Sequence, residues 1–491
     1  MKEVVLVILW FLLNAFIGLN ILILFEKKAY LFFLERIALS FLVGVGIVSI
    51  EMFIMGLLGL SFRIGFILFP WIVLFLYNIK FSKINLKNNL NFGINSLSKL
   101  EIALLLFIFF EIIYTFSRAL IKPMESYDCV AIYALKSKIL YLANTVPKEF
   151  FIDLGRNFHG VHPDYPLLLP LTETWFYVFI GAFNDILAKV ILPLLMSSFA
   201  VVFYFILKRI LKDRSLSLLF TFALVSIKQF NDYATIHVAD LILSIFYSLS
   251  LLYLFFWMDK KKDIFIILSV IFSILSLWTK NEGALLTAIN IFILLSYLLK
   301  SKATLNKKTL SKCVISLIVI FIFAFSWLGY RSYAGLVNEN FNISMIRIEY
   351  LKSHFKNIFL ILYEYQRQIF GFKKWNLIWV ILLFLLVTRF KESVDKNVFY
   401  ITLAIFLFFL GYTFVYIFST VEIDFFLKKT ASRFFLHILP ISVFWIALLT
   451  KEDNMKLSEL LPGVSIILLA KSLRSLARAG GGRRRIKRII Y

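Results

Sequence analysis

The stretch VVLVILWFLLNAFIGLNILILF, residues 4–25, carries no charged side chain and exceeds the ~18–20 apolar residues that a helix needs to cross a bilayer. The charged residues Glu26, Lys27 and Lys28 follow it without a small-residue cleavage site, so a retained first span is expected rather than a signal peptide. Similar runs recur along the chain, and 61% of its 491 residues are hydrophobic. Soluble domains contain about 45–50% apolar residues. The sequence therefore predicts an all-α, polytopic membrane protein.

Positive charge is spread over short connectors between these runs. The formal net charge is +24, and basic clusters such as Lys260–Lys262 and Lys307–Lys312 separate apolar segments. Such connectors face the cytoplasm under the positive-inside rule and meet anionic lipid headgroups. The charge therefore indicates orientation in a membrane, and nucleic acid is not expected as a partner. We expect a multi-pass protein of the inner (plasma) membrane.

The apolar pattern predicts about thirteen membrane-spanning helices. They are expected at residues 4–25, 34–60, 63–78, 100–118, 187–207, 216–231, 239–258, 263–279, 283–299, 313–331, 375–389, 398–418 and 433–449. The run 166–183 is treated differently, because a crossing there would place the basic residues 208–214 outside. It contains Pro166, Pro170 and Glu173, and we expect it to form a juxtamembrane helix.

The first expected outer loop, residues 120–165, contains two stretches that could carry chemistry. Asp128 directly follows a span, within reach of a lipid headgroup, and Lys136 lies two helical turns further on. An acid beside a lysine can activate a hydroxyl group while the lysine holds a phosphate. In the second stretch, closely spaced prolines rule out a continuous helix and fix His162 and Asp164 at the membrane surface. A solvated loop with ordinary charges remains the alternative for the first stretch, and an interfacial turn for the second.

Three later outer positions are also candidates. Asp240 lies at the mouth of a span, and Lys280 and Glu282 occupy a tight turn that does not need both charges. Arg433 belongs to a basic stretch that breaks the charge rule, which suggests a local anionic partner such as a lipid phosphate or diphosphate. A bound anionic lipid without catalysis is the alternative.

Taken together, these motifs resemble the GT-C class of membrane glycosyltransferases, closest to the protein-mannosyltransferase and aminoarabinose-transferase-like superfamily. The resemblance covers about residues 100–450 and rests on YDCVAIYALKSK, HPDYPLLLPL, ADL, TKNEG and SRFFLHILP, in that order. It implies a transmembrane catalytic module at 100–450, preceded by a three-helix membrane extension at 1–99 and followed by a basic cytoplasmic tail at 451–491. The implied site consists of catalytic Asp128 and Asp164 with substrate-binding Glu125, Lys136, His162, Asp240, Lys280, Glu282 and Arg433.

The resemblance implies transfer of a sugar from a polyprenyl-phosphate or polyprenyl-diphosphate donor to a glycan, lipid or protein acceptor at the extracytoplasmic face. A divalent cation stays open, because some members bind one and others do not, and no ligand spacing in this chain identifies a metal site. Two other interpretations remain. An O-antigen ligase or polymerase would use similar lipid-linked sugars, and a lipid-glycan flippase or transporter would perform no chemistry.

Overall fold

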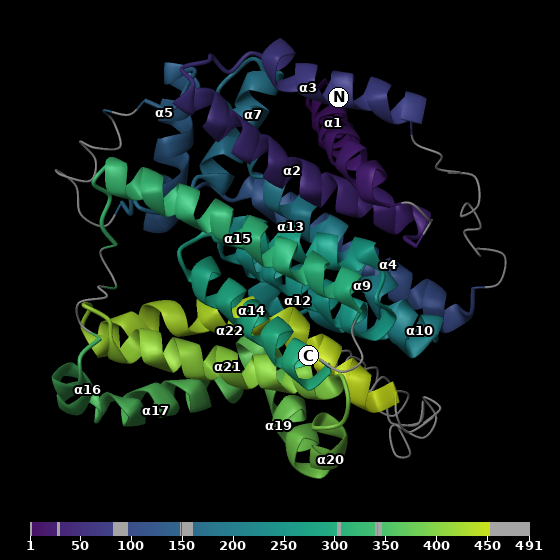
Figure 1. The fold of residues 1–491 in the computed structure, drawn as a ribbon, viewed down its shortest axis with the longest axis vertical. Coiled ribbons are helices and arrows are strands. Elements are labelled where there is room, and N and C mark those ends of the chain that lie inside the picture. The colour runs from purple at the N-terminus through teal and green to yellow at the C-terminus, as the bar shows by residue number, and fades with distance from the viewer. Residues whose placement is uncertain are drawn as a thin grey trace, which may run out of the picture.

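The structure, a computed structural model, describes residues 2–26, 30–81, 97–147, 149, 161–301, 306–338, 341 and 346–451. These residues form helices and connectors, with one isolated β-bridge between Phe341 and Ser419 (Figure 1). The all-α prediction is thereby confirmed for this part of the chain. The basic tail expected at 451–491 lies outside the described residues from position 452 onward.

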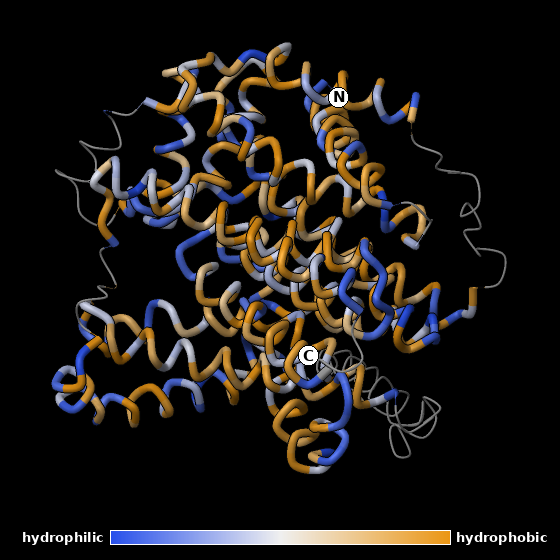
Figure 2. Tube along the Cα trace, in the orientation of Figure 1, coloured by the Kyte–Doolittle hydropathy of each residue, from blue (hydrophilic) through white to orange (hydrophobic). Residues whose placement is uncertain are grey.

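Ten helices in the described part of the chain are long and apolar enough to cross a membrane. They are α1 (Lys2–Phe25), α2 (Phe33–Leu57), α3 (Ile64–Phe81), α4 (Lys99–Ile121), α9 (Ile191–Leu211) with α8 (Asp185–Ala188) ahead of it, α12 (Asp240–Lys260), α14 (Glu282–Ser301), α15 (Lys307–Tyr333), α21 (Val398–Ile417) and α22 (Ile423–Lys451). Figure 2 shows hydrophobic residues along these helices. This supports a multi-pass membrane protein.

Shorter helices fill the connections between the long ones. They are the π-helix η3 (Asp128–Ala134), α5 (Leu135–Ala143), α7 (Leu168–Ile180), α10 (Arg214–Val225), α11 (Lys228–Ile236), α13 (Asp263–Thr279), α16 (Ile348–His354), α17 (Asn357–Ile369), α18 (Phe372–Trp375), α19 (Ile378–Thr388) and α20 (Phe390–Ser393). Three spans of the sequence prediction fall on α10, α13 and α19. The count of thirteen therefore depends on whether these shorter helices cross as well.

Several boundaries differ from the sequence prediction. The span expected at 216–231 breaks after Val225, and a separate helix, α11, follows. The outer loop expected at 420–432 is instead the start of α22, so Arg433 lies inside a helix. The run 166–183, expected to form a juxtamembrane helix, contains helix α7, which is buried from Leu168 to Tyr177, where it packs against α2 and α5.

Helices α1 and α2 cross in close contact because glycines leave room at their interface. A Cβ atom added at Gly18 would lie 1.8 Å from the carbonyl oxygen of Ser40, and one at Gly44 would lie 1.9 Å from that of Asn14. Small residues allow membrane helices to approach backbone to backbone. Helix α2 also packs against α7, α9 and α13, so the N-terminal helices form one body with the later ones.

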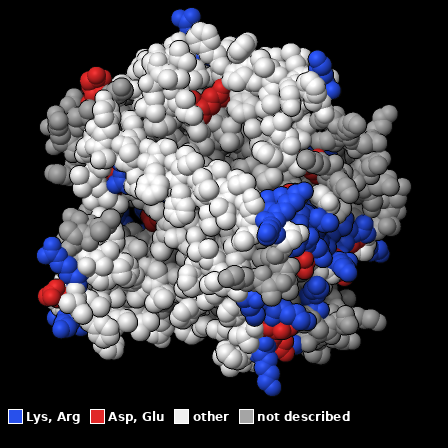
Figure 3. Space-filling model, viewed as in Figure 1, with Lys and Arg blue, Asp and Glu red and all other residues white. Residues whose placement is uncertain are grey.

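The centre of the bundle is α12, which is buried from Asp240 to Met258 and packs against α13, α14, α9 and α22. At one end of the bundle, the connections α9–α10, α12–α13 and α14–α15 carry clustered lysines and arginines, which we name the basic end. Lys and Arg gather on the right of the space-filling view, where α10 lies in Figure 1 (Figure 3). The opposite end, where α12 and α14 begin, contains the candidate site.

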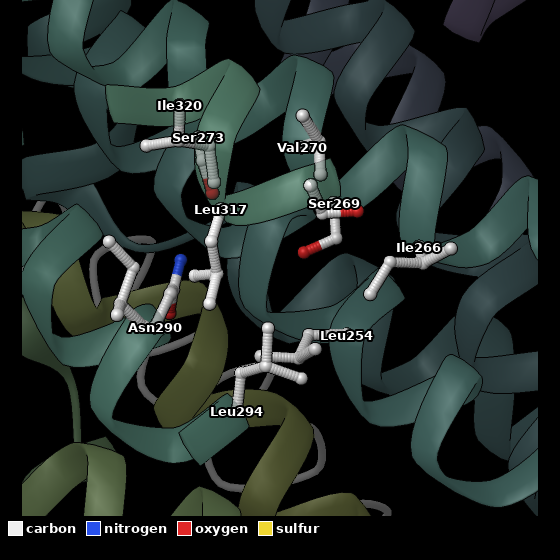
Figure 4. A pocket seen from close by; sticks show the side chains of 11 residues that line it. Leu254, Ile266, Ser269, Val270, Ser273, Asn290, Leu294, Leu317 and Ile320 are labelled. Atoms are coloured by element: carbon white, nitrogen blue, oxygen red, sulfur yellow. The ribbon is translucent and has the colours of Figure 1, made fainter. Parts of the chain in front are cut away.

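A small cavity of about 20 Å³ lies inside the bundle, between α12, α13, α14 and α15 (Figure 4). Its lining includes Ser273 and Asn290, and both side chains hydrogen-bond to the hydroxyl group of Ser250, at 2.6 and 2.7 Å. Its volume suits about one water molecule. The residues that line it include no ionisable side chain, so this cavity is not a candidate for chemistry.

Candidate functional site

A cavity of about 800 Å³ lies at the end of the bundle opposite the basic end. Its wall is formed by η3, the 161–167 connection, the turn between α13 and α14, the C-terminal part of α15, and the facing parts of α21 and α22. Two elements of its wall, the end of α15 and the start of α22, lie toward the left in Figure 1. Five of the site residues expected from the sequence line it: Asp128, His162, Lys280, Glu282 and Arg433.

Asp128 begins the π-helix η3, a wide helical form that is rare in proteins and frequent at functional sites. Its carboxylate accepts a hydrogen bond from Arg433 of α22, which is 305 residues further along the chain. Both side chains are mostly buried, with 11% of Asp128 and 19% of Arg433 exposed. The pair therefore places an acid and a permanent cation side by side on the cavity wall.

A second charged group surrounds Lys280, in the turn between α13 and α14. The Lys280 ammonium lies 3.0 Å from a carboxylate oxygen of Asp240 and 2.9 Å from one of Glu282. Burial alone would lower the pKa of Lys280, but the carboxylates of Asp240 and Glu282 hold it well above its usual range. His437 of α22 contacts the same Asp240 oxygen at 3.2 Å and the Tyr412 hydroxyl at 2.9 Å. Lys280 therefore stays a cation at the cavity.

Asp164 lies just behind the wall and is fully buried. It accepts a hydrogen bond from Asn281 and lies 3.7 Å from the guanidinium of Arg331. Burial raises the pKa of Asp164 to about 6, although Arg331 and the Asn281 hydrogen bond oppose the rise. His162, in a left-handed conformation with φ 44°, places its Nδ1 3.9 Å from Asp164 and stacks on Tyr165. Asp164 is therefore an acid that titrates near neutral pH beside the cavity.

Two expected site residues have other surroundings. The Lys136 ammonium is buried and donates to the backbone carbonyl of His162, so it ties α5 to the 161–167 connection. Glu125 is more than half exposed, pairs with Lys122 at 3.4 Å and is not among the residues lining the cavity. The structure thus brings eight of the nine expected residues to the cavity or its immediate shell, and Glu125 is the exception.

The remaining wall of the cavity is apolar and extends toward the middle of the bundle. Ala324 and Leu328 precede Arg331 on α15 by two turns and one turn, so the wall reaches about 10 Å below the charged groups. Three apolar lining residues are well exposed, with 51% of Leu328, 41% of Phe414 and 57% of Phe425 accessible. Helix α15 packs chiefly on α13, and α21 and α22 form the opposite wall. The cavity therefore combines a charged end with a partly exposed apolar side.

A buried carboxylate outside the cavity joins the segments that carry Asp128 and Asp240. Glu173 of α7 accepts a hydrogen bond from Ser137 of α5 and lies 2.6 Å from His237 Nε2. Ser137 follows the π-helix that bears Asp128, and His237, with φ 64°, precedes Asp240. Glu173 therefore fixes both segments relative to α7.

Two cavity residues and one supporting residue are not among the site residues expected from the sequence. Arg331 and Lys429 line the cavity, and His437 supports Asp240. Arg331 and Lys429 had a usable signal, since basic residues at an expected outer end break the charge rule. The signal for His437 was weaker, because it consisted only of a lone ionisable residue within an apolar run.

The described residues contain no preformed set of three metal ligands. No group of three His, Cys, Asp or Glu side chains among them is close enough to hold a metal ion. The carboxylates at the cavity contact Lys and Arg side chains instead. No step of a mechanism is therefore assigned to a metal.

Comparison of the chain with protein-family models, with curated proteins and with solved structures gives no match.

Proposed function

We propose that this protein is a membrane glycosyltransferase that transfers a sugar from a polyprenyl-phosphate or polyprenyl-diphosphate donor at the extracytoplasmic face. One observation carries the proposal: a single cavity has an acid and cations at its charged end and a partly exposed apolar wall. Such a cavity suits an amphipathic ligand whose phosphate joins a polar head to a long apolar chain. The basic end then faces the cytoplasm, and the cavity faces the opposite side.

The chemistry needs a base, an electrophile and a stabilised leaving group. Asp128 accepts the proton of an acceptor hydroxyl group while that oxygen forms a bond to the anomeric carbon. The bond from the anomeric carbon to the phosphate oxygen breaks at the same time, and its electron pair leaves with the lipid phosphate. Arg331, Lys429 and Arg433, which all line the cavity, stabilise the charge that develops on that phosphate. A single displacement inverts the configuration of the anomeric carbon.

Lipids that co-purify with the protein test the proposal. We expect mass spectrometry to find a polyprenyl-phosphate sugar on the Asp128→Asn variant and bare polyprenyl phosphate on the wild-type protein. Asp232→Asn is the matched control, since Asp232 pairs with Arg118 and Lys228 outside the cavity. Equal lipid profiles without any polyprenyl species would refute the donor assignment and favour a transporter.

A further inference from the structure

The ion pair between Asp128 and Arg433 restrains the group that the proposed reaction uses as a base. One Asp128 oxygen accepts a hydrogen bond from the Arg433 guanidinium. Because both side chains are mostly buried, little water screens their attraction. While the pair is formed, the guanidinium occupies one oxygen of this carboxylate, so that oxygen is not free to contact an acceptor hydroxyl group.

Arg433 has other partners that would hold it in place without Asp128. Arg433 donates a hydrogen bond to the Tyr233 hydroxyl oxygen, and the Asp240 carboxylate attracts the guanidinium. The Nε atom of Arg433 is buried and makes no hydrogen bond. The guanidinium can therefore release Asp128 and still offer donors to a second anion.

The charges around the cavity indicate where that anion would arrive. Lys429 precedes Arg433 by one turn of α22, lines the same cavity, is exposed and lies over the ring of Phe425. Lys280 is already paired with both Asp240 and Glu282. A phosphate entering along the apolar wall would meet Lys429 and Arg433 on one helical face.

We propose that Arg433 exchanges anionic partners, holding Asp128 in the empty site and the phosphate of the lipid donor in the loaded site. This inference rests on the proposed function and adds an order to it: the donor binds first, and its phosphate releases Asp128 to accept the proton of the acceptor. Both partners of Arg433 are anions, so one pair replaces another within the same surroundings. An acceptor, or water, that arrives before the donor meets a base that is still restrained.

Binding of farnesyl phosphate, a short polyprenyl phosphate, to the purified full-length protein tests the exchange. We expect Asp128→Asn to bind it more tightly than wild type by a factor in the range of about 5–150, typical of coupled equilibria, because the internal competitor is gone. Arg433→Gln should bind it more weakly than wild type. Farnesol, which lacks the phosphate, should bind wild type and Asp128→Asn equally.

Glu282→Gln is the matched control, because it removes one negative charge from the same cavity at a different cation. Equal tightening by Asp128→Asn and Glu282→Gln would reflect net charge alone and would overturn the exchange. Unchanged or weaker binding by Asp128→Asn would also overturn it while leaving the donor site intact. Absence of farnesyl phosphate binding to every variant would overturn the proposed function as well. If Asp128→Asn does not fold, Asp128→Ser provides the same comparison.

Discussion

Asp164 gives the folded protein a dependence on pH whose sign and size follow from its burial. The side chain is fully buried, and burial raises its pKa from 3.8 to about 6, against the opposing effect of Arg331. Between these values the folded state binds more protons than the unfolded state, so stability falls as pH rises. The loss of stability caused by ionising the buried Asp164 carboxyl group is absent below pH 3.8 and complete above about pH 6.

The size of this effect follows from the shift of the pKa. A rise of about two units corresponds to about 3 kcal/mol at about 1.4 kcal/mol per unit. An unfolding entropy of about 2.1 cal/mol/K per residue, applied to 491 residues, converts this into a change in Tm of about 3 °C. Asp164→Asn removes the titration, so its Tm should fall less than that of wild type between pH 4 and pH 7.

Thermal unfolding in detergent over this pH range measures the effect, with Asp232→Asn as the control. Burial would raise the pKa of Asp232, but hydrogen bonds from Lys228 and Arg118 outweigh it and lower the pKa. Asp232 therefore stabilises the fold at pH values above the usual carboxyl pKa and loses this effect only at lower pH. The Tm of Asp232→Asn should accordingly change with pH in parallel with that of wild type. Parallel profiles for wild type and Asp164→Asn would refute the reasoning.

Two further predictions concern packing. Gly18→Val should lower the free energy of unfolding by at least about 1–3 kcal/mol, because its Cβ would lie 1.8 Å from the Ser40 oxygen. Gly65→Val is the control, since no atom lies within 4 Å of its Cβ position, and its Tm in thermal unfolding should stay near that of wild type. Equal Tm values for the two variants would contradict the close contact of α1 and α2. Glu173→Leu should cost about 1–3 kcal/mol, because it removes the buried partner of His237; an unchanged Tm would show that this network is not structural.

The sequence alone predicts most of the long helices, because the length of an apolar run is a local property. The span expected at 398–418 coincides within one residue with α21. The break after Val225 was not predictable, since neither glycine nor proline marks it. The start of α22 was missed because its lysines resemble a loop, whereas in the structure Lys428 pairs with Asp424 one turn earlier.

The candidate site was only partly predictable, because its residues meet through tertiary contacts. The charge rule and the positions next to spans identified Asp128 and Arg433, but their pairing across 305 residues depends on how α22 packs. Glu125 was selected for its closeness to Asp128 in sequence, and the chain instead turns it toward Lys122 at 3.4 Å. His437 resembled an ordinary core residue until Asp240 was placed beside it.

Sugar transfer by the purified protein in liposomes tests the central claim most directly. Polyprenyl-phosphate hexoses and pentoses would be supplied as donors and an envelope lipid extract as acceptor, and the release of free polyprenyl phosphate would be measured. We predict release by wild type and by Asp232→Asn, and a rate about 10²–10⁴-fold lower for Asp128→Asn, the usual contribution of a general base. Release from no donor, or equal release by wild type and Asp128→Asn, would contradict the assignment of Asp128 as the base of a glycosyltransferase.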